Sequence, residues 1–305
     1  MAGEWGTQDW GTFPWGGFSV SNATEQPDSV VYFLDIYTRV SGHLRFANRD
    51  IFIFPAPSWK EQAISMGATS CWMLNEGSGV TVADSGINNI PLTATSAIVR
   101  GAPGPLAPLW DLNVAATFPG GGGVDGASGS PSGKANPGRN SFSVECWFNV
   151  AAVPVTGHGH TFAYRNSGTN IIALQMTDDP VIEFRLDVGG VIVADIMSLN
   201  AAFLADGNWH HLVGVRDVSI AQAIIYADGK QLASGNEATP IGNLNVGGAS
   251  VFVGSGDGVN STMAGNLFGV SWYERALTAG EVWENYVEGV QGPTGLRQPP
   301  EFRAL

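Results

Sequence analysis

The sequence contains few charged residues, and most of them are acidic. Only 13% of the 305 residues are charged, and the formal net charge at pH 7 is −13. The 14 Lys and Arg residues form no run along the chain. Binding to nucleic acid or to an anionic membrane surface depends on clustered cationic side chains. We therefore expect neither nucleic acid nor membrane as a partner.

Long apolar runs are also missing. No stretch approaches the roughly 18 apolar residues that a membrane helix needs. The N-terminus has neither the basic start nor the apolar core of a signal peptide. We therefore expect synthesis in the cytoplasm, with any later extracellular role reached by assembly into a particle and cell lysis.

Cysteine is nearly absent. Cys71 and Cys146 each precede a Trp within an apolar run, so each is predicted to lie on a strand and to face away from that Trp. Two buried free thiols are the favoured interpretation, and a disulfide is the alternative. No His lies near them in the sequence, which gives no support for a metal-binding or nucleophilic role.

Helical patterning is confined to one segment, TAGEVWENYVEG, where Thr278 is the expected N-cap, Glu281 completes a capping box and Gly289 is the expected C-cap. Elsewhere in residues 61–290, short β-branched and aromatic segments alternate with turns, and Asp228-Gly229 marks a hairpin. Many short strands with regular turns predict an all-β sandwich. The Gly-rich segment 119–140 is predicted to be flexible or to lie over a surface.

Five segments between residues 64 and 290 carry a resemblance to a known fold. They are MGATSCWMLNEGSGVTVADSGINNIPLTAT, NSFSVECWFNV, LADGNWHHLVGVRD, IIYADGKQLASG and NLFGVSWYERALTAGEVWENY. In this order they resemble the concanavalin A-like jelly roll of the laminin-G type. The resemblance implies a jelly-roll β-sandwich. Its aromatic strand residues are expected to fill the space between two sheets; these are Trp72, Trp147, Phe148, Trp209 and Trp272.

The resemblance also raises the question of calcium. Relatives often hold calcium at the turn that corresponds to Asp84–Asn89, and calcium prefers several oxygen ligands. The closing strand of the family usually carries an acidic residue where this chain has Gly269. The missing carboxylate disfavours calcium near Asp84, and an Asx-type turn that needs no metal is the preferred alternative. We therefore expect no cofactor and no metal.

Catalytic residues are hard to find. Glycosidases of this fold use two carboxylates that flank the scissile bond. Glu183 and Asp187 share one face of a strand, but we expect both to point to solvent, opposite Phe184 and Leu186. The sequence therefore favours a non-enzymatic protein.

The five histidines give no clear catalytic pattern. Of His210 and His211, we expect one to face the core and the other to face outward, and no Ser or Cys motif accompanies them. His158 and His160 are assigned to a Gly-rich rim loop, without the further ligands that a metal site would need. Residues 177–180 and 254–262 are predicted rim loops without an aromatic platform for a sugar.

The N-terminal segment repeats Trp-Gly at Trp5, Trp10 and Trp15. A five-residue period keeps to neither one helical face nor one strand face. Exposed aromatics favour association, and Trp is a preferred interface anchor. Packing of these rings on their own sandwich is the alternative. The predicted assembly contacts are Trp5, Trp10, Phe13, Trp15, Phe18 and, at the C-terminus, Phe302.

We divide the chain into an anchoring arm (1–29), a short β-strand attachment segment (30–60) with strands that end at Pro55 and Pro57, the jelly roll (61–290) and an extended tail (291–305). This order resembles virion proteins of tailed bacteriophages, of the fibre or capsid decoration type. It implies a non-enzymatic structural protein of the virion, forming homo-oligomers and binding other virion proteins, with host surface glycans as a further candidate partner. The alternatives are a free carbohydrate-binding lectin module and, less favoured, a glycoside-active enzyme.

Overall fold

The computed structural model describes the backbone of residues 29–40 and 43–55, and residues 59–105, 113–120, 126–155, 157–166, 170–238, 240–245, 249–256 and 262–291. The predicted assembly contacts Trp5, Trp10, Phe13, Trp15, Phe18 and Phe302 all lie outside these ranges. The chain separates into two compact units, residues 1–57 and residues 58–305.

The first unit contains a long antiparallel hairpin. Strand β1 (Ser29–Val40) pairs with β2 (His43–Pro55), with Val31 opposite Ile53 and one irregularity between Asp35 and Tyr37. The predicted end of a strand at Pro55 is confirmed. No third strand pairs with this hairpin in the described part of the chain.

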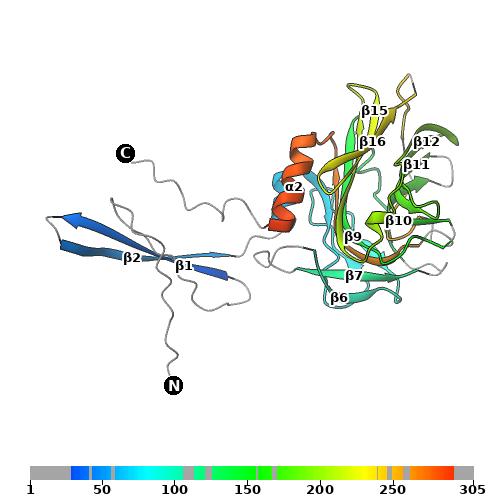
Figure 1. The fold of residues 1–305 in the computed structure, drawn as a ribbon. Helices are drawn as coiled ribbons and strands as arrows, with labels where there is room; N and C mark the ends of the chain where they lie inside the picture. Colours follow the sequence, from blue (N-terminus) through cyan, green and yellow to red (C-terminus); the bar gives the residue numbers. More distant parts are fainter. Residues whose placement is uncertain are drawn as a thin grey trace. The chain divides into compact units, whose positions relative to one another are not determined.

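The second unit is a sandwich of two antiparallel sheets (Figure 1). We call the first the β10–β13 sheet. Its order is β13 (Val191–Met197), β12 (Ile182–Val188), β11 (Asn170–Thr177), β10 (His158–Asn166), β17 (Ser250–Val253), β8 (Ala127–Gly129), β5 (Leu92–Ala94) and β4 (Thr81–Val82).

We call the second sheet the β9–β14 sheet. It contains the longest strand of each of the five segments that carry the family resemblance. Its order is β16 (Lys230–Asn236), β15 (Gln222–Ala227), β14 (Trp209–Asp217), β9 (Phe142–Asn149), β18 (Ala264–Tyr273), β7 (Val114–Pro119) and β6 (Val99–Pro103), and β3 (Ala68–Trp72) also pairs with β18. The Asp228-Gly229 hairpin between β15 and β16 is confirmed; both residues have positive φ, +49° and +74°, as a tight hairpin turn requires.

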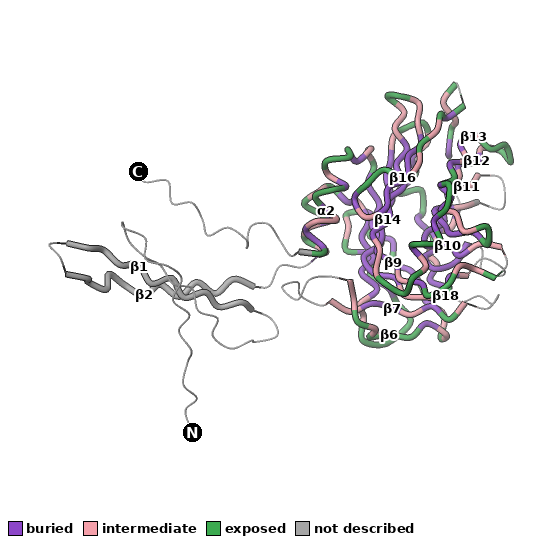
Figure 2. The backbone as a smooth tube through the Cα atoms, in the orientation of Figure 1, coloured by how far each residue is buried: buried purple, intermediate pink, exposed green. Residues whose placement is uncertain are grey.

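Aromatic side chains fill the space between the sheets, where the purple tube of Figure 2 marks buried residues. Phe142 and Trp272 stack with ring centroids 4.7 Å apart, and Trp72 and Phe148 belong to the same cluster. Burial of such a side chain contributes about 2–3 kcal/mol. The prediction for Trp72, Phe148 and Trp272 is therefore confirmed.

For Trp147 and Trp209 the prediction is wrong, because these side chains do not lie between the sheets. Both belong to a second apolar layer, on the outer face of the β9–β14 sheet, with Trp209 only partly buried. Trp147 lies edge-on to Trp59, with ring centroids 5.8 Å apart. Trp59 belongs to α1 (Trp59–Ser65), a helix that the sequence did not predict. Without that helix, the second layer could not be anticipated.

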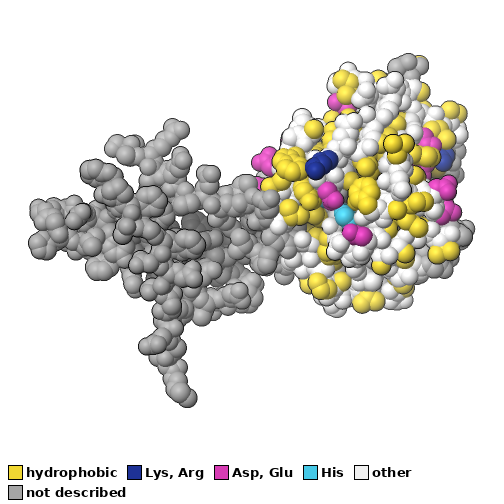
Figure 3. Space-filling model, viewed as in Figure 1, with side chains coloured by type: hydrophobic (Ala, Val, Ile, Leu, Met, Phe, Trp, Pro, Cys, Tyr) yellow, Lys and Arg dark blue, Asp and Glu magenta, His cyan; other side chains and the backbone are white. Residues whose placement is uncertain are grey.

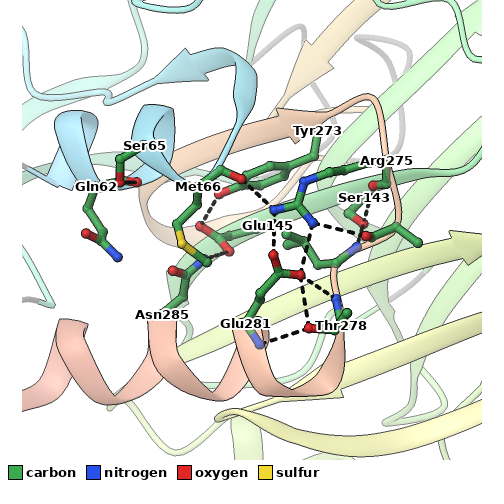
Figure 4. A network of polar contacts seen from close by, with 12 residues as sticks. Gln62, Ser65, Met66, Ser143, Glu145, Tyr273, Arg275, Thr278, Glu281 and Asn285 are labelled. Carbon is green, nitrogen blue, oxygen red and sulfur yellow. Dashed lines mark hydrogen bonds and ion pairs between the residues drawn. The ribbon is translucent and has the colours of Figure 1, made fainter.

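Helix α2 (Ala279–Gln291) completes this layer, and Figure 4 shows the polar contacts between the helix and the sheet. Its predicted capping box is confirmed: Glu281 N donates to Thr278 Oγ1 (3.2 Å), and Thr278 N donates to Glu281 Oε2 (2.8 Å). Below the helix, buried Glu145 accepts hydrogen bonds from Tyr273 Oη (3.1 Å) and from Asn285 Nδ2 (2.8 Å). These contacts fix α2 to the sheet.

Two further expectations need correction. Gly289 is not a C-cap, because α2 continues to Gln291. The segment 119–140 is not only a surface loop, because it contains β8, which pairs with both β17 and β5. Tyr164 Oη donates to the Lys134 carbonyl at 3.0 Å and holds the segment further. Residues 121–125 of this segment lie outside the described ranges. No helix in the described ranges is long and apolar enough to cross a membrane.

Candidate functional site

The candidate site is the outer face of the β10–β13 sheet. Both α-helices of the described residues pack on the other sheet. Alternation on β12 turns Ile182, Phe184 and Leu186 toward the core. Its intervening residues Glu183, Arg185 and Asp187 therefore face outward.

Register brings outward residues of neighbouring strands beside them. Gln175 on β11 pairs with Glu183 and with His160 on β10, while Arg185 pairs with Asp195 on β13. We call this set the polar floor; it consists of His160, Gln175, Glu183, Arg185, Asp187 and Asp195. Figure 3 shows acidic and basic side chains together at the edge of the molecule where β11 and β12 lie.

The polar floor is deeply set, although it faces outward. Glu183 and Gln175 are each 2% exposed and Asp187 is 3% exposed. Glu183 and Asp187 lie on the strand face opposite Phe184 and Leu186, as predicted. The expectation that they are exposed to solvent is wrong, because neighbouring groups cover them. A Cβ atom on Gly256 would lie 2.4 Å from His160 Cε1, so the 254–256 segment covers one end.

Two pairings define the electrostatics of the floor. Gln175 Nε2 donates a short hydrogen bond to Glu183 Oε2. Burial raises the pKa of Glu183 to about 7; the Gln175 hydrogen bond opposes the shift, and Asp195 adds to it. Arg185 holds Asp187 with Nε at 3.0 Å and Nη2 at 2.8 Å. This bidentate contact raises the pKa of Arg185.

Two acceptors of the floor have no partner among the residues that the structure describes. Gln175 Oε1 and Asp195 Oδ1 are buried and accept no hydrogen bond from those residues. An unsatisfied buried polar atom costs about 1–3 kcal/mol, and such atoms in a folded protein call for an explanation. A bound group that donates hydrogen bonds would satisfy both.

The Asp84 turn has a different character. Asp84 Oδ1 accepts from the backbone N–H groups of Cys71 and Gly86, and Oδ2 accepts from Ile90 N–H, all at 2.8 Å. Both oxygens therefore face N–H donors, which suits an Asx-type turn and does not suit a cation. Gly269, at φ +59°, leaves space for Trp59, whose Cδ1 would lie 2.9 Å from a Cβ there.

The histidines are distributed as follows. His211 is fully buried beneath α2, with Nε2 3.5 Å from Glu145 Oε2. His210 lies at the rim, where Nδ1 is 2.8 Å from Asp228 Oδ2 and Nε2 is 3.1 Å from Asp206 Oδ1. His158 and His160 both belong to β10, not to a rim loop, and His160 is part of the polar floor. No cluster of three metal-ligating side chains occurs among the residues that the structure describes.

Both cysteines are buried and free, and each faces away from its neighbouring Trp: Cys71 and Trp147 lie in the helix-side layer, Trp72 and Cys146 between the sheets. Sequence reasoning missed Gln175 and Asp195 as site residues. Polar and apolar residues alternate on β12 but not on β11 or β13, so only the presence of a single polar residue inside each of these apolar strands could have indicated them.

The comparisons with known proteins agree with this architecture. A family model, the "Concanavalin A-like lectin/glucanases superfamily", matches residues 121–283, which is more than half of the chain. The chain belongs to this superfamily.

Individual relatives are distant. Human neuronal pentraxin-1 is 23% identical over 156 residues, and the match spans 49% of this chain and 34% of that protein. The chain thus corresponds to about a third of the length of that relative.

Solved structures share the fold. The binding domain of botulinum neurotoxin serotype G has a TM-score of 0.55 at 14% identity, covering 72% of this chain and 50% of that chain. Domain 4 of AbnA, an extracellular arabinanase of Geobacillus stearothermophilus solved with arabinotriose, has a TM-score of 0.52 at 17% identity, covering 72% of this chain and 98% of that domain. At these identities the likeness establishes the fold alone.

Proposed function

We propose that the sandwich is a non-enzymatic, lectin-like module that binds a saccharide at the polar floor. The observation that carries this proposal is a pair of buried acceptors, Gln175 Oε1 and Asp195 Oδ1, for which the described part of the chain supplies no donor, on a sheet face that neither described α-helix covers. Saccharide hydroxyls are donors of the required kind. Domain 4 of AbnA, solved with arabinotriose, shares the fold and so supports the ligand class.

An aromatic side chain lies in the same row of the sheet. Phe252 on β17 pairs with Ala163, and its strand neighbours Val251 and Val253 face the core. Phe252 therefore faces outward, and it is partly exposed. Phe252 lies two strands from Gln175, so one extended oligosaccharide could contact both the apolar ring and the acceptor, a combination that sugar recognition uses.

The floor is less suited to hydrolysis. Glycoside cleavage needs two free carboxyl groups that flank the bond. Asp187 is held by Arg185, and Glu183 accepts from Gln175. We expect no release of reducing ends from any polysaccharide that the protein binds.

A glycan array with the full chain tests the proposal. Binding to a defined glycan that Gln175→Ala and Asp195→Ala weaken together, while thermal stability is retained, is the expected result. Glu284→Gln is the matched control, because Glu284 is exposed on α2, beyond the other sheet. Binding that tolerates both floor substitutions would refute the floor as the site.

We further propose that this module is displayed on a virion of the tailed-bacteriophage type, anchored by the N-terminal unit. The β1–β2 hairpin supports this role, because an isolated two-stranded sheet is marginally stable in water and no other described strand pairs with either of its edges. Strand addition to copies of the chain, or to other virion proteins, would satisfy those edges.

Trp5, Trp10, Phe13, Trp15, Phe18 and Phe302 remain the proposed assembly contacts. Removal of residues 1–29 is expected to abolish incorporation into particles while leaving the thermal transition of the sandwich unchanged. Normal incorporation of the truncated protein would contradict the anchoring role. A monomeric full-length protein would contradict self-association.

A further inference from the structure

We propose that the polar floor selects saccharides that donate hydrogen bonds and carry no negative charge, and that sugars with a free amino group are its tightest ligands. This inference rests on the proposed saccharide-binding function and adds the class of sugar. Sialylated and uronic saccharides would be excluded.

The buried polar atoms of the floor that lack a partner among the described residues are all acceptors. Gln175 Oε1 and Asp195 Oδ1 are both acceptors, and the amide nitrogen of Gln175 already donates to Glu183. A hydroxyl or an ammonium group supplies the missing donor. An ionised carboxylate only accepts, so it would leave both atoms unsatisfied.

The charges around these acceptors favour a cation. Asp195 raises the pKa of Glu183 through a side-chain hydrogen bond and through its charge. The nearest cation in the register, Arg185, is already paired with Asp187. An ammonium group would therefore favour the state in which both acidic side chains are ionised, whereas an anionic sugar would oppose it.

The basic groups at the margin do not change this balance. Arg165 on β10 donates a hydrogen bond to the Gly256 carbonyl at 3.3 Å. His160 lies under the 254–256 segment. Both groups are on the β10 side of Gln175, whereas Asp195 lies on the opposite, β13 side.

The test compares three oligosaccharide classes of equal length by calorimetry with the full chain: glucosamine oligomers, N-acetylglucosamine oligomers and uronic-acid oligomers. A charge-assisted hydrogen bond exceeds a neutral one by enough to predict about tenfold tighter binding of the amino sugar than of its acetylated form. Uronic oligomers are expected not to bind.

Asp195→Asn preserves the size of the side chain and removes its charge. This variant is expected to lose the preference for the amino sugar while it still binds the acetylated oligomer. Glu284→Gln removes one charge from the exposed surface of α2 and should leave the preference intact. An equal effect of both variants would mean general attraction to an acidic protein, and would overturn the inference.

The remaining outcomes are distinguishable. Binding of uronic oligomers as tightly as glucosamine oligomers would overturn the selectivity but leave saccharide binding standing. Absence of binding to every class, here and on the array, would overturn the proposed function itself.

Discussion

Gly289 of α2 lies directly against the indole ring of Trp147. A Cβ atom at position 289 would stand 2.2 Å from Cζ2 of that ring. Position 289 is therefore a glycine because the ring of Trp147 occupies the space that a side chain there would need. It does not mark the end of the helix. Trp147 in turn contacts Trp59 of α1, so this indole ring joins α2 to α1 on the outer face of the β9–β14 sheet.

Gly289→Ala is expected to lower the free energy of unfolding by about 1–3 kcal/mol, since the added methyl group must displace packed atoms. The matched control is Gly280→Ala in the same helix, where the nearest atom to a new Cβ is 3.9 Å away. This control should leave stability unchanged or raise it slightly, through helix propensity. Urea denaturation of both variants makes the comparison, and equal stability of the two would contradict the packing argument.

A second prediction concerns Arg216 and Glu237, whose side chains are fully buried and form a close ion pair. Arg216→Met would leave the Glu237 carboxylate buried without its partner. We expect a loss of about 3–5 kcal/mol in unfolding free energy. The double variant Arg216→Met/Glu237→Leu should lose less than the sum of its single variants, and strict additivity in a double-mutant cycle would argue against coupling.

The third prediction concerns pH. Burial lowers the pKa of His210, but hydrogen bonds and charges from Asp228 and Asp206 outweigh it and raise the pKa above its usual 6.5. Protonated His210 therefore stabilises the folded state. This contribution is fully present below about pH 6.5 and is lost as pH rises through the higher folded-state pKa.

Melting temperatures between pH 5 and 9 test this prediction. Relative to His210→Gln, the natural protein should lose its stability advantage as pH rises above about 6.5. Parallel curves for the two proteins would show that His210 does not titrate with folding.

The fourth prediction concerns the thiols. Burial raises the pKa of Cys71 and of Cys146 to about 12, so neither forms a thiolate at neutral pH. We expect no reaction with a disulfide reagent in the native state and two equivalents of reaction after unfolding. Rapid labelling of the folded protein would contradict the burial of both cysteines.

Local pattern was sufficient for much of the fold. Alternating strands predicted the sandwich, Asp228-Gly229 predicted a hairpin, and Thr278 with Glu281 predicted the start of α2. These features depend on residues close together in the chain. Alternation also placed Cys71 and Cys146 opposite their neighbouring Trp residues, but it did not place Trp147 and Trp209 on the correct face of the sheet.

The candidate site was only partly predictable. Glu183 was correctly turned away from the core, but its surroundings come from other strands: Gln175 pairs with it from β11, and Asp195 influences it from β13. Strand order is set by long-range pairing, and no spacing within β12 reveals which residues will stand beside it.

The sequence by itself determined the class of fold, the hairpin and helix-start signals and the alternation of side chains along a strand, because these follow from local backbone geometry. Only the tertiary structure decided that Trp147 packs under helices instead of between sheets, that the Gly-rich segment supplies a strand, and that two acceptors are buried without a donor among the described residues. Each of these features depends on which distant segments of the chain pack together, because those contacts decide which side chains are buried and which polar atoms find a hydrogen-bond partner.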